Sequence, residues 1–435
     1  MNSKQEYETE RTLLVHLDSV RMEEREDPVE FMELALSAGA TVVEMVKINR
    51  YQPGARFLIG AGKVEELAEQ VREQSIELVI FNQSLTPSQE RNLERTLGCR
   101  VLDRVGLILD IFAQRAHTHE GKLQVELAQL EHISTRLVRS RTDLSRQQGG
   151  IGLRGPGETQ LESDRRLLRG RMRQIRSRLE KVRNQRELAR RSRRRAEIPA
   201  VSLVGYTNAG KSTLFNRLTE ASVYAADQLF ATLDPTVRRL ELDNVGPVML
   251  VDTVGFIRHL PHKLVEAFRA TLEESASADL LLHVIDAAAE QRDEQIEQVR
   301  AVLAEIGAAE VPVLEVYNKT DLLDAIEPHI QRDADGVPVR VWLSAQKQAG
   351  LDLLLEAIVD CLGREMFNAT LRLPPQMARL RGLLFAADAV VSEEHTETGE
   401  ALLNVSMPLM ELNRLLSREK IEVDPFIQHF VYKAD

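Results

Sequence analysis

Short apolar runs alternate with amphipathic segments along the first part of the chain. The apolar runs predict strands at residues 13–17, 41–48 and 77–81, and the segments between them predict helices at 29–37, 63–74 and 87–97. Strands that alternate with helices are typical of an α/β domain, which we expect over residues 1–112. Residues 60–63 read GAGK before a helix. The second half of a phosphate-binding loop is missing there, so we interpret them as structural.

The pattern changes between residues 113 and 196, where two segments each carry one apolar stripe at helical spacing. The stripes consist of Leu123, Leu127, Leu130, Ile133 and Leu137, and of Leu168, Met172, Ile175, Leu179 and Val182. Two such helices should pair antiparallel and bury these stripes against each other. The joining segment, 139–160, has five glycines between 149 and 157 and cannot hold a core of its own.

Charge is concentrated on the second of these predicted helices. Residues 165–195 hold 15 Lys and Arg against two acidic residues, a balance of +13, whereas the whole chain carries −11 and the remainder therefore −24. One arginine block on an acidic protein is typical of a factor that contacts RNA at one place. The other interpretation is a solvated helix face. The candidate RNA contacts are Arg154 in the glycine-rich tip and Arg171, Arg173, Arg176 and Arg178 on the helix.

The remaining chain predicts two further domains. Residues 197–363 contain apolar strands at 200–204, 248–251, 313–317 and 341–345, as expected for a mixed sheet flanked by helices. Residues 364–435 predict a small C-terminal α/β domain with strands at 369–373, 387–391 and 402–405 and a helix at 408–416. The predicted fold class is therefore a multidomain α/β protein.

Four motifs between residues 205 and 321 stand in the order found in guanine-nucleotide-binding proteins. They read GYTNAGKS at 205–212, FATLDPT at 230–236, DTVG at 252–255 and NKTD at 318–321. The first follows a strand and opens a helix, which is the context of a phosphate loop. Gly205 and Gly210 let backbone N–H groups turn toward phosphates at a helix N-terminus, and Lys211 reaches the β- and γ-phosphates.

The second and third motifs predict a magnesium site and a switch. The hydroxyl of Ser212 and the carboxylate of Asp252 are expected to hold Mg²⁺, and the hydroxyl of Thr232 to complete the shell only when GTP is bound. Segment 225–237 would then order with GTP and loosen after hydrolysis. The backbone N–H of Gly255 can contact the γ-phosphate. We assign catalytic roles to Lys211, Thr232 and Gly255.

The fourth motif selects the base. The Asp321 carboxylate can accept both the guanine N1–H and the exocyclic amine, which adenine does not offer, while Asn318 and Lys319 brace the phosphate loop and flank the base. Ser344 and Ala345 follow a strand at the place where a loop usually touches guanine O6. The residues expected to contact GTP or GDP are Gly205, Tyr206, Thr207, Asn208, Ala209, Gly210, Lys211, Ser212, Thr213, Phe230, Ala231, Thr232, Leu233, Asp234, Asp252, Thr253, Val254, Gly255, Asn318, Lys319, Thr320, Asp321, Ser344, Ala345 and Gln346.

One position departs from the Ras-like pattern. The residue after DTVG is Phe256, where Ras-like proteins carry a glutamine that orients the attacking water. A phenyl ring cannot do this, so hydrolysis should be slow unless another group or a partner supplies the function. Asn208 resembles the asparagine of potassium-activated GTPases, in which K⁺ replaces an arginine finger. The alternative is that Asn208 only stabilises the loop.

Composition excludes several other classes. No apolar run approaches the ~18 residues of a membrane span, and the N-terminus is polar and acidic rather than a signal peptide. The two cysteines, Cys99 and Cys361, have no metal or disulfide spacing. We therefore expect a cytoplasmic, monomeric protein.

Longer signatures resemble the HflX family of ribosome-associated GTPases. They lie at 106–116 (GLILDIFAQRA), 120–130 (EGKLQVELAQL), 149–162 (GGIGLRGPGETQLE) and 230–236 (FATLDPT). The resemblance covers residues from about 10 to 430 and implies an N-terminal α/β domain, a helical hairpin, a Ras-like G domain and a small C-terminal domain. It also implies binding to the large ribosomal subunit with the tip near the peptidyl-transferase centre, and the splitting or rescue of stalled ribosomes.

Other classes of RNA-associated GTPase are alternatives to this interpretation. A tRNA-modifying GTPase of the potassium-activated kind usually ends in a cysteine motif, whereas this chain ends FVYKAD. An assembly GTPase with a KH module needs a G-x-x-G clamp, and beyond residue 365 the only glycines are Gly382 and Gly399. A large-subunit assembly factor without that module is the second candidate.

Overall fold

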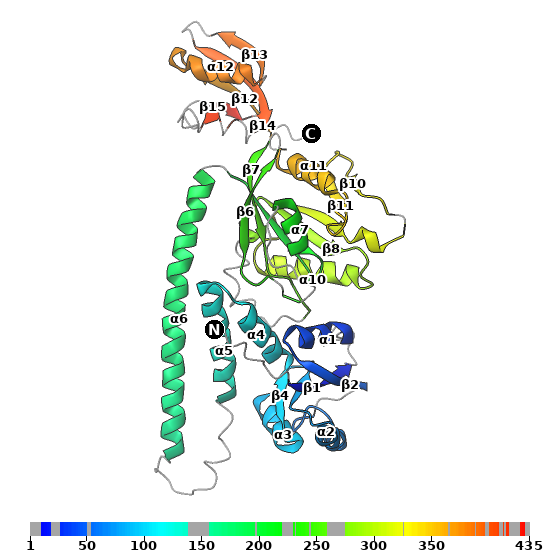
Figure 1. The fold of residues 1–435 in the computed structure, drawn as a ribbon. Helices are drawn as coiled ribbons and strands as arrows, with labels where there is room; N and C mark the ends of the chain where they lie inside the picture. Colours follow the sequence, from blue (N-terminus) through cyan, green and yellow to red (C-terminus); the bar gives the residue numbers. More distant parts are fainter. Residues whose placement is uncertain are drawn as a thin grey trace, which may run out of the picture. The chain divides into compact units, whose positions relative to one another are not determined.

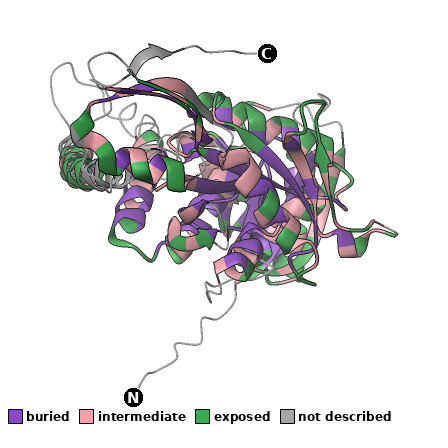
Figure 2. Ribbon diagram, turned by 90° about the horizontal axis from the view of Figure 1, so that it is seen from above, coloured by how far each residue is buried: buried purple, intermediate pink, exposed green. Residues whose placement is uncertain are grey.

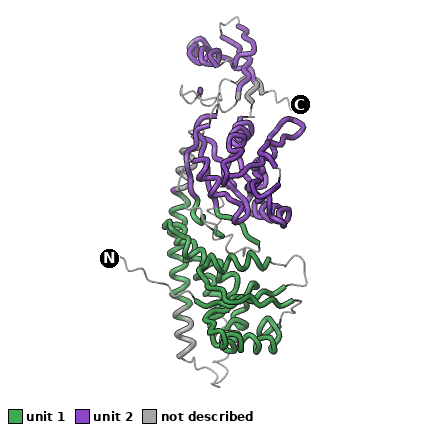
Figure 3. The backbone as a smooth tube through the Cα atoms, turned by 45° about the vertical axis from the view of Figure 1, so that its right-hand side comes forward, with its two compact units in different colours: residues 1–184, 224–235, 254–272 green, residues 185–223, 236–253, 273–435 purple. Residues whose placement is uncertain are grey.

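The chain forms two compact units in the computed structural model. The structure describes residues 10–18, 27–49, 54–137, 156–195, 198–219, 229–230, 232–242, 245–258, 275–324, 326–363, 366–387, 389–395, 400–408, 412, 415–416 and 427–430. Unit 1 comprises residues 1–184, 224–235 and 254–272, and unit 2 comprises 185–223, 236–253 and 273–435 (Figure 3). Residues 225–235 of the predicted switch segment therefore group with the N-terminal part of the chain, whereas 236–237 belong to unit 2.

The N-terminal part of unit 1 is a parallel sheet covered by helices (Figure 1). Its strands are β1 (Arg11–Asp18), β2 (Thr41–Asn49), β3 (Leu78–Phe81) and β4 (Arg100–Asp103), in the order β2-β1-β3-β4. Its helices are α1 (Pro28–Ser37), α2 (Ala61–Glu73), α3 (Pro87–Leu97) and α4 (Arg104–Arg115). The predicted α/β alternation is confirmed, with β4 and α4 as additional elements. The expected boundary at residue 112 falls inside α4.

Local sequence explains several helix starts in this sheet. Pro87 occupies the first turn of α3, and Thr86 and Gln89 cap it reciprocally in a capping box. Gly60 precedes α2, and Lys63 pairs with Glu66 one turn further along the same helix at 2.5 Å. The GAGK segment is thus a helix start, in agreement with the structural interpretation.

Helices α5 (His119–Leu137) and α6 (Pro156–Arg195) form the predicted hairpin, and both are visible in Figure 1. Leu123 and Leu127 pack against Ile175, with Leu130, Met172 and Leu179 at the edges of the same cluster. These parts of the two apolar stripes therefore meet as predicted, whereas Ile133 of the predicted stripe is exposed. Helix α6 begins at Pro156, inside the segment expected to be a loop, since proline is well suited to the first turn of a helix. The glycine-rich tip up to residue 155, including Arg154, lies outside the described residues.

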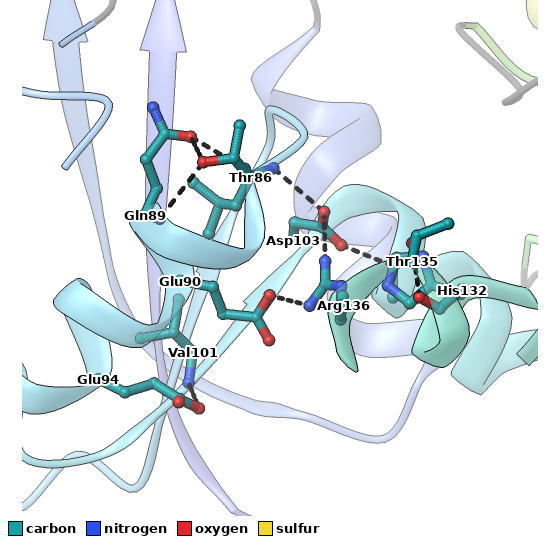
Figure 4. A network of polar contacts seen from close by, with 11 residues as sticks. Thr86, Gln89, Glu90, Glu94, Val101, Asp103, His132, Thr135 and Arg136 are labelled. Carbon is teal, nitrogen blue, oxygen red and sulfur yellow. Dashed lines mark hydrogen bonds and ion pairs between the residues drawn. The ribbon is translucent and has the colours of Figure 1, made fainter. Parts of the chain in front are cut away.

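A partly buried ion-pair network attaches the end of α5 to the N-terminal sheet and to α3 (Figure 4). Arg136 donates to Asp103 at 2.9 Å and also pairs with Glu90 of α3. Asp103 caps α4 through the Gly106 N–H at 2.8 Å and also accepts from the Leu85 N–H at 3.1 Å. Burial raises the pKa of Asp103 and lowers the pKa of Arg136. The ion pair thus has to offset a desolvation cost on both partners.

Unit 2 contains the predicted mixed sheet of the G domain. Its strands are β5 (Ala200–Gly205), β6 (Thr236–Leu242), β7 (Gly246–Asp252), β8 (Leu280–Asp286), β9 (Val313–Asn318), β10 (His329–Arg332) and β11 (Pro338–Trp342). Their order is β10-β11-β9-β8-β5-β7-β6, with β6 and β10 antiparallel to their neighbours. Helices α7 (Lys211–Thr219), α10 (Arg292–Glu305) and α11 (Leu351–Leu362) accompany the sheet. The central strands are buried (purple in Figure 2).

The C-terminal part of unit 2 contains an antiparallel sheet accompanied by helix α12. Strands β12 (Met366–Leu373), β13 (Val390–His395), β14 (Ala401–Pro408) and β15 (Ile427–Phe430) stand in the order β13-β14-β12-β15, and α12 spans Ala378–Ala386. The strand expected at 387–391 begins later, because Ala387 still caps α12. The helix expected from Pro408 was placed too early, because Pro408 ends β14; Leu412, Leu415 and Leu416 are helical. Strand β15 was not predicted.

Across the described segments, we find no helix with the length and apolar character that a bilayer crossing requires.

Candidate guanine-nucleotide site

The phosphate loop is held in shape by two glycines whose places no side chain could fill. Gly205 has φ +145° and Gly210 has φ +94°, a region that favours glycine. A Cβ at Gly205 would overlap the carbonyl oxygen of Val284 in β8, and a Cβ at Gly210 would overlap the side-chain amide of Asn318. The loop therefore packs directly on the neighbouring strand and on the base-reading motif.

Lys211 and Ser212 begin α7 at the end of this loop. The Lys211 ammonium donates to the carbonyl oxygens of Gly205 at 3.1 Å and Tyr206 at 2.7 Å, and burial lowers its pKa to about 8. The Ser212 hydroxyl donates to Oδ2 of Asp252 at the end of β7, at 2.8 Å. A hydroxyl and a carboxylate at this separation are hard oxygen ligands suited to Mg²⁺. Thr253 is turned away, because its hydroxyl donates to the Leu203 carbonyl oxygen at 2.6 Å.

The base-reading residues form a second connected cluster. The Asn318 amide donates to the Ala209 carbonyl oxygen and accepts from the Ala345 N–H, both at 2.9 Å. The Ser344 hydroxyl donates to Asp321 at 2.6 Å. Asn318 thus ties the phosphate loop to the segment after β11, as its predicted bracing role requires. Thr320 is buried, whereas Gln346 is exposed.

One supporting residue was missed from the sequence. Asp286 ends β8 and pairs with Lys319 at 2.7 Å, while Lys319 itself has φ +65°. An aspartate at the end of a strand adjacent to the base-reading strand was the available signal. This ion pair fixes the lysine that is expected to flank the base.

The remaining selected residues of the second and third motifs belong to unit 1. Phe230, Thr232 and Leu233 are buried, and Val254 and Gly255 are buried as well. Ala231 lies outside the described residues. Asp234, which we selected as a nucleotide contact, has its carboxylate at the N-terminus of α5, where it accepts from the Thr118 N–H at 2.8 Å.

Phe256 and Asn208 bear on the mechanism of hydrolysis. The phenyl ring of Phe256 is only 2% exposed and so belongs to the core of unit 1. Asn208 has φ +62°, a conformation that asparagine tolerates better than most residues. The backbone conformation of the loop therefore explains the asparagine at position 208 without potassium, and both interpretations of this residue stay open.

Comparison with known proteins covers nearly the whole chain. Family models match residues 25–113 ("GTP-binding GTPase N-terminal"), 115–193 ("GTP-binding GTPase Middle Region") and 200–319 ("50S ribosome-binding GTPase"). The GTPase HflX of Escherichia coli K12 is 56% identical over 96% of this chain and 98% of its own length. The GTPase HflX of Caldanaerobacter subterraneus is 47% identical over 90% of this chain and 89% of its own.

The chain belongs to the HflX family of GTPases. It therefore binds guanine nucleotide and hydrolyses GTP. The solved structure of a GTP-binding protein from the archaeon Sulfolobus solfataricus in complex with GDP aligns over 81% of this chain and 98% of that one, at 26% identity and a TM-score of 0.44.

The arginines selected as RNA contacts in this HflX-family chain do not share one environment. Arg171 donates to both carboxylate oxygens of Glu126 at 2.6 and 2.9 Å, and Arg176 pairs with Glu131 at 2.7 Å. These two side chains hold α6 to α5. In the described part of the chain, neither Arg173 nor Arg178 forms an ion pair with an acidic side chain, and both are exposed.

Proposed function

We propose that this GTPase binds the large ribosomal subunit and separates the subunits of stalled ribosomes. The observation that carries the proposal is the α5–α6 hairpin, in which apolar residues of the two helices form one cluster while exposed arginines line α6. Exposed arginines on a rigid helix suit sequence-independent contact with phosphates. The matched family description, "50S ribosome-binding GTPase", supports the same partner.

The glycine-rich tip is the part that we expect to reach rRNA near the peptidyl-transferase centre. It joins α5 to α6, and the helix that carries the arginines begins at Pro156 immediately after it. In this proposal the arginine face of α6 supplies affinity, while the tip acts by close steric approach. Arg154 would make its contact there.

Ribosome stimulation of hydrolysis forms a second part of the proposal. Lys211, Ser212 and Asp252 provide phosphate and Mg²⁺ contacts, and Thr232 and Gly255 would join them with GTP. The buried ring of Phe256 has no group that could orient water. The ribosome would therefore supply or position the missing group. A comparison of hydrolysis in KCl and NaCl tests whether K⁺ at Asn208 contributes.

Sedimentation of intact ribosomes with the protein tests the main proposal. Free subunits should appear with a nonhydrolysable GTP analogue and should not appear with GDP. A variant with a shortened 149–155 tip should still bind large subunits but release none. Binding to large subunits without any separation of intact ribosomes would contradict splitting and favour the alternative, a large-subunit assembly factor.

A further inference from the structure

The switch segment 229–234 is bonded to the first turn of α5. Thr118 caps this helix, because its hydroxyl accepts from the Gly121 N–H at 2.9 Å. Asp234 holds the cap: its Oδ2 accepts from the N–H groups of His117 at 2.9 Å and Thr118 at 2.8 Å, and its Oδ1 accepts from the Thr118 hydroxyl at 2.5 Å. A carboxylate at this end also interacts favourably with the helix dipole.

Gly121 makes this arrangement sterically possible. A Cβ on Gly121 would overlap Oδ1 of Asp234 and would also lie 3.2 Å from the Thr118 hydroxyl oxygen. Glycine in a helix interior is normally unfavourable compared with alanine, by about 1 kcal/mol. Its presence in the first turn of α5 is explained by the space that Asp234 occupies.

Two further contacts fix the same segment on helices α4 and α1. Phe230 packs edge-on against Phe112 of α4, with ring centroids 4.7 Å apart and an interplanar angle of 83°. The Leu229 N–H donates to the Ser37 hydroxyl at the end of α1, at 3.2 Å. Phe230 and Leu233 are each 2% exposed. In this structure the described part of the switch segment is therefore packed as tightly as a core element.

We propose that Asp234 is a positioning residue for GTP hydrolysis, acting through Thr232 and coupling the nucleotide state to the hairpin. The inference rests on the proposed function, in which Thr232 meets Mg²⁺ with GTP and the hairpin meets the ribosome. Thr232 and Asp234 are two residues apart, so their Cα atoms are separated by at most about 7 Å. A movement that takes Thr232 beyond this distance from the bound Asp234 must therefore carry the carboxylate away from the cap.

The direction of the coupling follows from the packing. A γ-phosphate orders a switch segment, and its loss releases it. Leu229, Phe230, Thr232 and Leu233 are buried next to the bonded Asp234, and we therefore assign the capped arrangement to the state that GTP favours. Coupling between two sites is reciprocal in binding free energy. A partner that holds the hairpin with its cap intact therefore strengthens GTP binding relative to GDP.

Two variants of the full-length chain break the contact in opposite ways. Asp234→Ala removes the carboxylate, whereas Gly121→Ala expels it while raising the intrinsic helix propensity of α5. A loss of coupling in Gly121→Ala therefore cannot come from a weaker helix. Gly170→Ala on α6 is the matched control, because nothing lies within 4 Å of a Cβ at that position. Thr118→Ser keeps the capping hydroxyl and Thr118→Val removes it.

Hydrogen exchange and nucleotide affinity provide the readouts. In the parent chain the His117 and Thr118 amides should exchange more slowly with a nonhydrolysable GTP analogue than with GDP. This difference should vanish in Asp234→Ala, Gly121→Ala and Thr118→Val. The same variants should bind the GTP analogue about five-fold more weakly relative to GDP, as expected for the loss of one helix cap, and should hydrolyse GTP more slowly. Gly170→Ala and Thr118→Ser should behave as the parent does.

Equal exchange of these amides with the two nucleotides in the parent chain would overturn the proposal. So would a Gly121→Ala variant that matches Gly170→Ala in its GTP-to-GDP affinity ratio. Neither readout needs ribosomes, so a failure of ribosome binding would count against the proposed function alone. If the protein splits ribosomes but its His117 and Thr118 amides exchange equally with the two nucleotides, the proposed function stands and the proposed coupling is rejected.

Discussion

The Ser344 hydroxyl donates a hydrogen bond to Oδ1 of Asp321 at 2.6 Å. Ser344 also accepts from the Lys347 N–H at 3.1 Å, so the serine itself is held in place by the turn that follows β11. A carboxylate can accept through both of its oxygens. The serine therefore orients Asp321 toward the base and leaves its capacity to accept the two guanine N–H donors.

Asp321→Asn should exchange the nucleotide specificity of the site. An amide nitrogen opposite the exocyclic amine of guanine sets donor against donor, which should cost GTP affinity about 100-fold or more. Xanthine carries a carbonyl oxygen in place of that amine, so affinity for its nucleotide should rise. Calorimetric titration with both nucleotides measures the exchange. Ser344→Ala, which removes only the orienting contact, should weaken GTP binding about five-fold; an Asp321→Asn variant with parental GTP affinity would contradict the assignment.

Nucleotide affinity should fall as the pH rises through the pKa of Lys211. Burial lowers this pKa to about 8, and phosphate oxygens beside the ammonium would raise it again. Binding must then take up a proton above about pH 8, so affinity should decline there by up to about ten-fold per pH unit. Titrations in two buffers with different ionisation enthalpies count the protons directly. Constant affinity and no proton uptake between about pH 7 and 9 would contradict this.

Local motifs made most of the nucleotide site predictable. The phosphate loop, Asp252 and the NKTD motif each identify themselves through residues that are adjacent in sequence, and the strands leading into them are short apolar runs. The two helical stripes could also be predicted, because the spacing of apolar residues indicates which face of a helix is buried.

Contacts between distant segments could not be predicted in the same way. The contact between Asp234 and Thr118 joins residues 116 positions apart, and neither residue is unusual in its own sequence context. The ion pair of Arg171 with Glu126 depends on how the two helices are aligned along each other, which the arginine count does not reveal. Strand β15 has only four residues, too few to show a period.

His283 should make the G-domain sheet sensitive to acid. It lies in β8, 2% exposed, and burial lowers its pKa to about 4, with Arg300 and Lys211 acting in the same direction and Glu315 opposing them. The unfolded chain binds a proton near pH 6.5 that the folded chain does not accept until about pH 4. Folding stability is therefore lost as the pH falls through this interval, by about 3 kcal/mol in total.

His283→Leu should flatten this acid dependence. The chain has one tryptophan, Trp342, which ends β11 in the same sheet, so its fluorescence follows the unfolding of that sheet. Urea midpoints of the variant and the parent should be compared from pH 7 down to about pH 4.5. The stability difference between the two proteins should shift in favour of the variant as the pH falls. If the stability difference between variant and parent stays constant across this pH range, groups other than His283 cause the acid sensitivity.

Arg173 and Arg178 should contribute phosphate contacts without affecting the stability of the hairpin. Both are exposed on α6, whereas Arg171 and Arg176 are engaged with Glu126 and Glu131 of α5. Each released counterion adds roughly one unit to the slope of log affinity against log salt concentration. The double change Arg173→Gln and Arg178→Gln should therefore weaken binding to large ribosomal subunits and reduce this slope by about two units.

A matched control removes the same charge from another part of the chain. Arg72 and Arg95 are exposed on α2 and α3, so the double change Arg72→Gln and Arg95→Gln lowers the net charge equally without touching the hairpin. If the arginine face of α6 binds rRNA, only the hairpin variant should lose slope in a salt titration, and both variants should melt as the parent does. An equal loss in both would indicate a general charge effect, and no loss in either would reduce the arginine face to a solvated helix surface.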